Sequence, residues 1–396
     1  MKKIIITFAL VLIYSVTFSQ WIEIYKATTY LQSIYFTDAN TGYIVAQAGY
    51  IFKTTDAGTS WVEKSSGTTE DLNSVYFKNS NVGYAVGDNG TILKTTDGGD
   101  NWVRYKNAGF FYNSVYFTDI DTGYIVGQNG YMYKTTNGGT TWTMQTSGSN
   151  SDLNSVCFTD ANTGYIAGGG GLLLKTTNGG TKWTKQTSGT TCCLYSLCFL
   201  DSAIGYAVGK YGTILKTTNG GNTWTPQISE MAQMYLDLRS VYFTDSNTGY
   251  AVGYDGYIIN TTNGGTKWAC HRFGNDDMYT RYSVFFTSKD TGYTVGFEHL
   301  FKTFNGSTTY IGESTLTKTE INVYPNPCNN ELKINLNSLL DNPITIKIFN
   351  IQGLLVKSIT TNNNENIINI SNLSKGIYFV KVVGNNINVY ERVIKL

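Results

Sequence analysis

The chain has 396 residues, of which 41% are hydrophobic and 14% aromatic, so it is long enough for two or three domains, and a small disulfide-stapled scaffold is excluded. Charged residues make up 14%, against roughly 25% in an average soluble protein, and the net charge of +1 gives no attraction to nucleic acid. The 42 glycines and 30 tyrosines, beside only 4 prolines, favour strands and tight turns. We therefore expect an all-β extracellular protein.

Residues 1–19 have the pattern of a secretory signal peptide. Lys2 and Lys3 precede an apolar stretch at residues 4–16, and the segment ends in Thr17-Phe18-Ser19. The apolar stretch would span about 20 Å as a helix, which is short of the roughly 30 Å hydrocarbon core of a membrane. We expect cleavage before Gln20, export across the inner membrane, and no transmembrane segment in the mature chain.

A repeat of about 40 residues fills the next part of the chain. Residues 31–310 hold seven copies, and each contains a Gly-Tyr pair and four short strand signals, for example at residues 72–77, 84–87, 91–95 and 102–105. Four strands in this length, repeated seven times, predict a seven-bladed β-propeller over residues 20–311. The tryptophans that mark the repeat are Trp21, Trp61, Trp102, Trp142, Trp183, Trp224 and Trp268.

The repeat also predicts how the ring closes and what fills it. Residues 21–24 resemble the last strand of a unit yet precede the first unit, so they are expected to complete the seventh blade, where Tyr310 replaces the usual tryptophan. A phenylalanine, such as Phe36, is expected in the core between blades. Serine stands three residues before it in every unit, where the innermost strands converge and a small side chain fits. The serines are Ser33, Ser74, Ser114, Ser155, Ser196, Ser240 and Ser283.

The turn before each tryptophan matches the Asp-box pattern S/T-x-D-x-G-x-S/T-W, with Asn in place of Asp in most copies. Asp or Asn bonds its own backbone in such a turn, and Gly supplies a positive φ, so we assign these residues a structural role. A calcium site is the weaker interpretation because most copies lack the carboxylate. The structural residues are Asp56, Asp97, Asn137, Asn178, Asn219 and Asn263.

On these motifs the repeats resemble the photosystem II stability and assembly factor family over about 280 residues and, more distantly, sialidases and xyloglucan-degrading glycosidases. Sialidases use three clustered arginines with a Tyr/Glu pair, and the assembly factors present a basic patch. The four arginines of this repeat region, Arg104, Arg239, Arg272 and Arg281, are scattered along the sequence. No functional residue of those families is therefore carried over.

Six cysteines and two histidines complete the inventory of metal-binding and redox side chains. There is no C-x-x-C spacing, so neither a zinc site nor another metal site or cofactor is expected. Cys157 and Cys198 occupy equivalent positions of neighbouring units and are interpreted as small core residues too far apart to bond. The adjacent Cys192 and Cys193 are the one pair worth a redox test.

The repeat stops after Tyr310, and a linker at residues 312–320 leads to a segment at residues 321–396. This segment contains Val323-Tyr324-Pro325-Asn326-Pro327, then ITIKIFNIQG from Ile344, then LSKGIYFVKV from Leu373. It is similar to the type A C-terminal sorting domain of the type IX (Por) secretion system. That resemblance implies a small Ig-like β-sandwich, recognition by the type IX machinery at the outer membrane, and a protein released or attached to surface lipopolysaccharide. An ordinary adhesion sandwich is the alternative.

The two faces of the predicted ring differ in sequence. One face carries nearly invariant turns, whereas the other carries variable loops, where binding usually resides. The leading hypothesis is a non-enzymatic exported protein that binds a glycan, polymer or protein there. A glycoside hydrolase using two of Asp255, Asp276, Asp277 and Glu298 is the alternative, and a surface scaffold is a third possibility. The candidate binding residues are Phe110, Phe111, Tyr112, Tyr211, Met234, Tyr235, Tyr254, Asp255, Tyr279, Arg281, Phe297, Glu298 and His299.

Overall fold

A computed structural model describes residues 21–106, 109–229, 236–272, 279–304, 321–336, 343–350, 354–384 and 387–396. The regular elements in these ranges are strands and short 3-10 turns, which confirms the predicted all-β class. No helix within them is long and apolar enough to cross a membrane. The chain divides into two compact units between Tyr310 and Ile311. The predicted signal peptide and linker lie outside the described residues and stay predictions.

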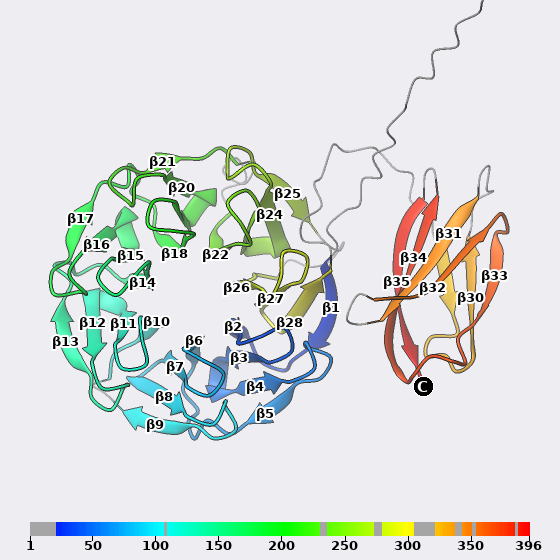
Figure 1. Cartoon of the computed structure of the whole chain (residues 1–396), viewed down its shortest axis with the longest axis horizontal. Coiled ribbons are helices and arrows are strands. Elements are labelled where there is room, and N and C mark those ends of the chain that lie inside the picture. Colours follow the sequence, from blue (N-terminus) through cyan, green and yellow to red (C-terminus); the bar gives the residue numbers. More distant parts are fainter. Residues whose placement is uncertain are drawn as a thin grey trace, which may run out of the picture. The chain divides into compact units, whose positions relative to one another are not determined.

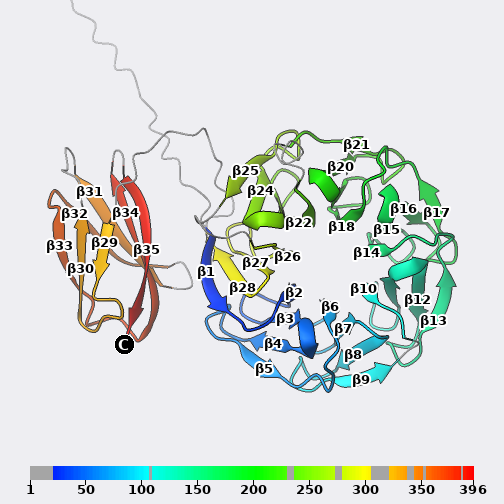
Figure 2. The same cartoon turned by 180° about the vertical axis from the view of Figure 1, so that it is seen from behind.

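The first unit is a ring of four-stranded antiparallel sheets, seven of them in the described residues (Figure 1). Each sheet is one blade and has its first strand nearest the ring centre and its fourth at the rim (Figure 2). The blades, in chain order, are β2 (Leu31–Phe36), β3 (Gly42–Ala46), β4 (Ile51–Thr54), β5 (Val62–Lys64); β6 (Leu72–Phe77), β7 (Gly83–Gly87), β8 (Thr91–Thr95), β9 (Val103–Lys106); β10 (Tyr112–Phe117), β11 (Gly123–Gly127), β12 (Tyr131–Thr135), β13 (Thr143–Thr146); β14 (Leu153–Phe158), β15 (Gly164–Gly168), β16 (Leu173–Thr176), β17 (Thr184–Gln186); β18 (Leu194–Phe199), β19 (Gly205–Gly209), β20 (Ile214–Thr217), β21 (Thr225–Pro226); β22 (Leu238–Phe243), β23 (Gly249–Gly253), β24 (Tyr257–Thr261), β25 (Ala269–Arg272); and β26 (Ser283–Phe286), β27 (Gly292–Gly296), β28 (His299–Thr303) with β1 (Trp21–Lys26).

Strand β1 closes the ring as the sequence predicts. It pairs antiparallel with β28, with Trp21 opposite Thr303, and so supplies the outer strand of blade 7. Trp21 is 4% exposed, and its ring meets that of Phe286 edge-on at 5.8 Å. The other tryptophans of the repeat meet the phenylalanine of their own blade in the same way, for example Trp102 and Phe77 at 5.9 Å. Trp21 therefore takes the place of the tryptophan that blade 7 lacks; Tyr310 lies outside the described residues.

The serines of the innermost strands do more than fit a narrow space. The Ser33 hydroxyl accepts a hydrogen bond from the backbone N–H of Val75 in the next blade at 3.4 Å. The same contact recurs at every blade boundary, and Ser283 completes the circuit by accepting from the Ile34 N–H at 3.3 Å. A ring of inter-blade hydrogen bonds thus joins all innermost strands. The other five acceptors are Ser74, Ser114, Ser155, Ser196 and Ser240.

The repeated phenylalanines fill the spaces between blades, as predicted. Phe77 stacks on Tyr43 of the preceding blade with ring centroids 3.9 Å apart, and the Tyr43 hydroxyl donates to the carbonyl oxygen of Gly98 in the next Asp-box turn at 2.7 Å. Six of the seven boundaries therefore combine stacking of about 1 kcal/mol with a satisfied buried hydroxyl; the Tyr250 hydroxyl is buried without a hydrogen-bond partner in the described residues. The remaining stacked pairs are Tyr84–Phe117, Tyr124–Phe158, Tyr165–Phe199, Tyr206–Phe243, Tyr250–Phe286 and Tyr293–Phe36.

The Asp-box turns are held by local hydrogen bonds. Asp56 Oδ1 accepts bonds from the Thr54 hydroxyl at 2.7 Å and the Ser60 N–H at 2.9 Å. Burial opposes ionisation of Asp56, but these hydrogen bonds outweigh it and hold the pKa of the carboxyl below its ordinary value. Asn178 makes the same bonds to Thr176 and Lys182, both at 2.9 Å. The turn therefore works without a charge, which is why Asn replaces Asp.

Gly180→Ala in the fourth Asp-box is expected to lower the free energy of unfolding by about 1 kcal/mol more than Gly189→Ala does. Both glycines have a positive φ, 77° and 75°, so both changes introduce similar backbone strain. A Cβ on Gly180 would lie 2.8 Å from Cε1 of Tyr124, whereas one on Gly189 would meet nothing within 4 Å. Chemical denaturation measures the difference. Equal losses would show that the Tyr124 contact contributes nothing.

The second unit is a two-sheet sandwich with its own core. One sheet has the order β29-β30-β33 and the other β32-β31-β34-β35. Ile334 from the first sheet and Ile346 and Val380 from the second belong to one buried cluster. The predicted sandwich is therefore present in the described residues, and its Ig-like topology stays a prediction. The strands are β29 (Ile321–Tyr324), β30 (Glu331–Leu336), β31 (Ile344–Asn350), β32 (Leu355–Thr361), β33 (Glu365–Asn369), β34 (Gly376–Gly384) and β35 (Ile387–Lys395).

Candidate functional site

The second residue of each innermost strand lies near the loop that enters the blade from the preceding one. The residue type at this position differs between the two halves of the ring. In blades 2 to 4 it is Asn, and its side-chain amide donates to a backbone carbonyl of the next blade; Asn154, for example, donates to Leu194 O at 2.8 Å. Blades 5 and 6 carry Tyr195 and Arg239 instead, and blade 7 has Tyr282 at the equivalent position, directly before β26. Large aromatic and cationic groups thus replace a structural amide on one side of the ring.

Arg239 organises a compact group that we call the Arg239 cluster: Tyr195, Asp237, Arg239 and Tyr254. Its guanidinium carbon lies 4.1 Å from the ring centroid of Tyr195 and 4.9 Å from that of Tyr254. Nη2 donates to the Tyr254 hydroxyl at 2.7 Å and lies 3.7 Å from Asp237 Oδ2. The two rings and the carboxylate hold the guanidinium in one orientation, and 26% of the Arg239 side chain stays exposed.

Asp237 orients this cluster from below the surface. Its side chain is 8% exposed. Its Oδ2 accepts the Tyr195 hydroxyl at 3.2 Å and its Oδ1 accepts the Tyr211 N–H at 3.1 Å. Burial raises the pKa of Tyr195 to about 12, so that hydroxyl keeps its proton at neutral pH. Both carboxylate oxygens are engaged, which suits a positioning role rather than proton transfer.

Tyr211 stands beside the cluster in an unfavourable backbone conformation. In blades 1 to 6 the turn between the second and third strands places two consecutive residues at positive φ, the second of which is always glycine. The first is Ala48, Asn89, Asn129, Gly170, Tyr211 or Asp255. Tyr211 has φ 58°, and an L side chain there costs about 1 to 2 kcal/mol. Its ring is nevertheless 45% exposed, and Lys210 Nζ lies 4.7 Å from the ring centroid. The backbone conformation is common to the repeat, so Tyr211 is distinguished by the large exposed aromatic side chain that it carries there.

A second group of predicted residues lies where the first and last blades meet. Phe297 stacks between Tyr30 and Tyr279, at 4.2 Å and 4.9 Å. His299 stacks on Tyr279 at 4.8 Å, and its Nδ1 lies 3.1 Å from Glu23 Oε1 in β1. His299 is only 6% exposed, which corrects its assignment to a binding surface. Its imidazole links β28 to β1 within blade 7.

Two further predicted binding residues are buried. Tyr112 is 0% and Arg281 1% exposed. Both stand two residues before the serine of their innermost strand. Leu238 has this position in blade 6 and faces the core. The sequence pattern placed them in loops, and a shift of one residue at the strand boundary moves them from surface to interior. Arg281 packs its guanidinium 3.6 Å from the Phe301 ring centroid.

The other predicted residues have varied surroundings. Phe111 is 43% exposed, and Phe110 stacks on Tyr131 at 3.7 Å. Asp255 follows Tyr254 in the turn at φ 56°, and Glu298 lies 3.9 Å from Lys26. The structure therefore brings Tyr211 and Tyr254 together with Arg239 and separates them from Phe110 and Phe111 in blade 3. Met234 and Tyr235 lie outside the described residues.

The sequence analysis missed Tyr195 and Asp237, and it set Arg239 aside as a scattered arginine. The signal that would have found two of them is the break in the inner-strand series from Asn73, Asn113 and Asn154 to Tyr195 and Arg239. In a repeat protein, a unit whose residue differs from that of the other units at an equivalent position is a candidate for a functional role.

The cysteines are all free thiols. Cys157 and Cys198 occupy the position in their innermost strands that Tyr116 occupies in blade 3. Burial raises the pKa of both thiols, to about 11 for Cys198. Such protonated thiols are weak nucleophiles and weak metal ligands. In the described part of the chain, no group of three or more His, Cys, Asp or Glu side chains is arranged to hold a metal ion.

Comparison with known proteins places the propeller in a family. The family model described as "Photosynthesis system II assembly factor YCF48" matches residues 14–109, 110–190 and 187–276 in succession. The chain belongs to this family. The YCF48-family region is followed by a match to the "Secretion system C-terminal sorting domain" at residues 322–396. No protein of the curated set matches the chain.

Solved structures show the same fold. A structure titled "YCF48 bound to D1 peptide" is 18% identical, with a TM-score of 0.62 over 73% of this chain and 98% of the other. YCF48 from Cyanidioschyzon merolae is 19% identical, with a TM-score of 0.61 over 73% and 99%. At such identities the likeness carries the fold alone, so the role of this YCF48-family propeller rests on its own side chains.

Proposed function

We propose that this protein is an exported binding protein that holds a segment of another protein at the Arg239 cluster. The family assignment and the secretion tail support an exported propeller. The type IX machinery, acting through residues 321–396, would deliver it to the cell surface or the medium. The predicted signal peptide supplies the first membrane crossing.

The observation that carries the proposal is the oriented guanidinium of Arg239 between two tyrosine rings. Aromatic side chains and arginine dominate the energetics of protein interfaces because they combine apolar area with directed hydrogen bonds. Tyr211, exposed despite its backbone strain, extends this surface. A structurally similar protein is titled "YCF48 bound to D1 peptide", which favours a protein ligand over a glycan.

A glycoside hydrolase is the weaker alternative. That reaction needs two carboxyl groups about 5 to 9 Å apart across a groove. Of the four candidate carboxylates, Glu298 of blade 7 is paired with Lys26, and Asp255 lies in the turn after β23 of blade 6. Asp276 and Asp277 lie outside the described residues. The contacts that are described therefore favour binding.

Tyr254→Ala is expected to weaken binding of the partner by about tenfold or more, because it removes one ring and the hydroxyl that orient Arg239. A photo-crosslinking residue at position 210 of the exported protein, which lies beside the cluster and leaves its four residues intact, identifies the partner. Titration with that purified partner measures affinity. Gln128→Ala, at the equivalent turn position of blade 3, is the matched control and is expected to change affinity less than twofold. Equal losses in the two variants, or no adduct specific to position 210, would contradict the proposal.

A further inference from the structure

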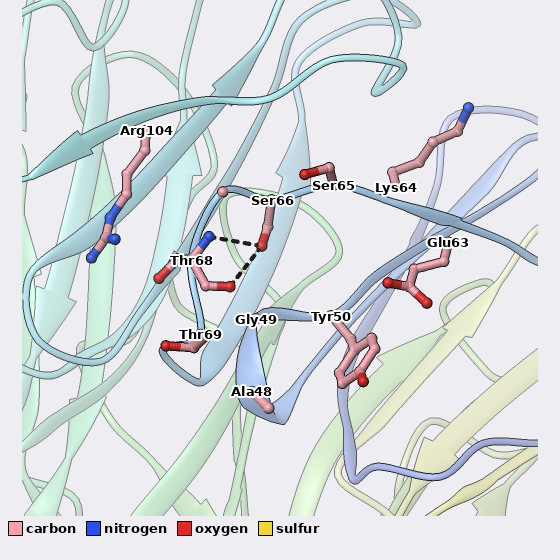
Figure 3. A pocket seen from close by; sticks show the side chains of 11 residues that line it. Ala48, Gly49, Tyr50, Glu63, Lys64, Ser65, Ser66, Thr68, Thr69 and Arg104 are labelled. Atoms are coloured by element: carbon pink, nitrogen blue, oxygen red, sulfur yellow. Dashed lines mark hydrogen bonds between the residues drawn. The ribbon is translucent and has the colours of Figure 1, made fainter.

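A pocket of about 580 Å³ opens between blades 1 and 2, away from the Arg239 cluster of blades 5 and 6. It lies between the β3–β4 turn, strand β5 with the loop after it, and one side chain from β9 (Figure 3). Its volume falls within the roughly 300 to 1,000 Å³ of small-molecule sites. The residues at its wall are Ala48, Gly49, Tyr50, Glu63, Lys64, Ser65, Ser66, Gly67, Thr68, Thr69 and Arg104.

The floor of this pocket is rigid. The Ser66 hydroxyl donates to Thr68 O at 3.2 Å and accepts the Thr68 N–H at 3.3 Å, which fixes the loop after β5. Gly49, at φ 77°, lets the turn approach so closely that a Cβ there would lie 2.1 Å from Thr68 O. The Ala48 N–H is bound by Asp71 Oδ1 at 2.8 Å. Polar groups on such a frame are held in place before a ligand arrives.

We call the Ser66–Thr68 loop and the Gly49 turn that packs against it the frame. Blades 3 and 4 have an equivalent frame, but the side chains around it differ. Ser147 in blade 3 makes the same contacts to Ser149 as Ser66 makes to Thr68. There, however, Met144 stands in the position of Glu63, and Tyr131, in the position of Tyr50, is covered by Phe110. The frame is therefore structural. The chemistry specific to blade 1 lies in Tyr50, Glu63 and Arg104.

The charges of the pocket are separated. Figure 3 shows Arg104 at one end and Glu63 with Tyr50 at the other, and the hydroxyls of Ser66, Thr68 and Thr69 lie between them. Lys64 is paired with Asp100 at 2.9 Å, a carboxylate that it shares with Lys53 at 3.0 Å. Within the described residues Arg104 makes no ion pair, and its one hydrogen bond goes to the Thr91 hydroxyl, at 3.4 Å. A guanidinium without a carboxylate partner among these residues therefore faces a hydroxyl-lined wall.

Tyr50 supplies an aromatic surface of fixed orientation. Its ring is parallel to that of Phe52, with an interplanar angle of 3° and centroids 5.9 Å apart. An aromatic face next to hydroxyls and a carboxylate suits a sugar, whose C–H face packs on the ring and whose hydroxyls bond the polar groups. The guanidinium of Arg104 adds a planar donor pair for a carboxylate.

We propose that this pocket binds an acidic sugar unit of the hexuronate type. The sugar ring packs against Tyr50, its hydroxyls bond Glu63 and the Ser/Thr wall, and its carboxylate pairs with Arg104. The inference does not rest on the proposed protein-binding function. Tyr254→Ala is therefore expected to leave sugar binding unchanged, so the two proposals fail separately.

The test is calorimetric titration of the purified full-length protein with trigalacturonate and with neutral galactotriose. We expect saturable binding of the acidic trisaccharide and at least about tenfold weaker binding of the neutral one. Arg104→Gln is expected to weaken the acidic ligand by about tenfold, because it removes the paired charge. Lys185→Gln makes the same change of charge at the equivalent position of blade 4, next to the blade 3 frame, and is expected to change affinity less than twofold.

A second variant separates the aromatic contribution from the charge. Tyr50→Leu, which copies Leu172 of blade 4, is expected to weaken the acidic and neutral ligands by the same factor, since it removes stacking but leaves Arg104. The proposal is overturned if trigalacturonate does not bind saturably or if both trisaccharides bind equally. It is also overturned if Arg104→Gln and Lys185→Gln weaken binding equally, which would indicate diffuse attraction to a polyanion.

Discussion

Raising the pH from about 8 to about 11 is expected to unfold the propeller cooperatively. The tyrosine of the Gly-Tyr pair that begins the second strand of each blade is at most 1% exposed. Burial raises the pKa of these side chains, to about 12 for Tyr43, Tyr124 and Tyr165. In the unfolded chain the phenol titrates near pH 10. The other members of this set with a raised pKa are Tyr84, Tyr206, Tyr250 and Tyr293.

The sign of the effect follows from proton binding. Below pH 10 these phenols are protonated in both states, so their contribution to stability is fully present. Between about pH 10 and pH 12 the unfolded chain releases protons that the folded chain keeps, and the free energy of unfolding falls. The loss is about 1.4 kcal/mol per tyrosine one pH unit above its unfolded pKa. Summed over the set, it is comparable with a typical total stability of about 5 to 15 kcal/mol.

Lys302 acts in the opposite direction. It is 2% exposed, and burial lowers its pKa to about 8, although Asp56 partly opposes the shift. Between pH 8 and about pH 10.4 the unfolded state holds one proton more than the folded state at this side chain, so stability rises with pH there. One lysine is outweighed by the tyrosine set above pH 10, and the net result is alkaline unfolding.

Near-ultraviolet absorbance of tyrosinate, recorded together with circular dichroism, tests this expectation. The buried set should ionise only in step with loss of the β signal. If all tyrosines ionise near pH 10 while the β signal persists, the burial of the Gly-Tyr set has been overestimated.

Removing residues 321–396 is expected to reduce the protein in the medium and on the cell surface by about tenfold or more and to leave it in the periplasm. Those residues match the secretion sorting domain. The buried hydrophobic cluster of residues 321–396 contains residues of the second unit only. The propeller therefore keeps its own core when residues 321–396 are removed. Fractionation with immunoblotting measures location, and the melting temperature of the truncated protein reports its fold. Truncated protein in the medium at the full-length level would show that another signal directs export.

The fold could be predicted from sequence because the same strand and turn signals recur in seven units. Trp21 before the first unit was sufficient to predict how β1 closes the ring. The inner serines were predicted for their size alone, because a single sequence does not show that the hydroxyl of Ser33 meets the N–H of Val75 in the next blade. Hydrogen bonds between units depend on how blades pack, which no local pattern contains.

The candidate site was predicted only in part. Tyr254 and Tyr211 were found because turns that vary on a rigid scaffold suggest binding. Asp237 and Arg239 lie at the boundary between a loop and an inner strand, where a sequence pattern fixes element ends to within only about two to four residues. The same uncertainty placed Tyr112 and Arg281 at the surface, although both are buried.

The pairing of β1 with β28 also determines the order in which the molecule can form. Nearly the whole propeller separates Trp21 from its partner Thr303, and contacts this distant in sequence form slowly. Blades 1 to 6 consist of strands that follow one another directly, so each can assemble as the chain emerges from a translocation channel. Blade 7 must wait for both ends. Until then β28 is an unpaired edge that accepts any matching strand, including β1 of another molecule, and the last folding step is a choice between self-closure and domain exchange.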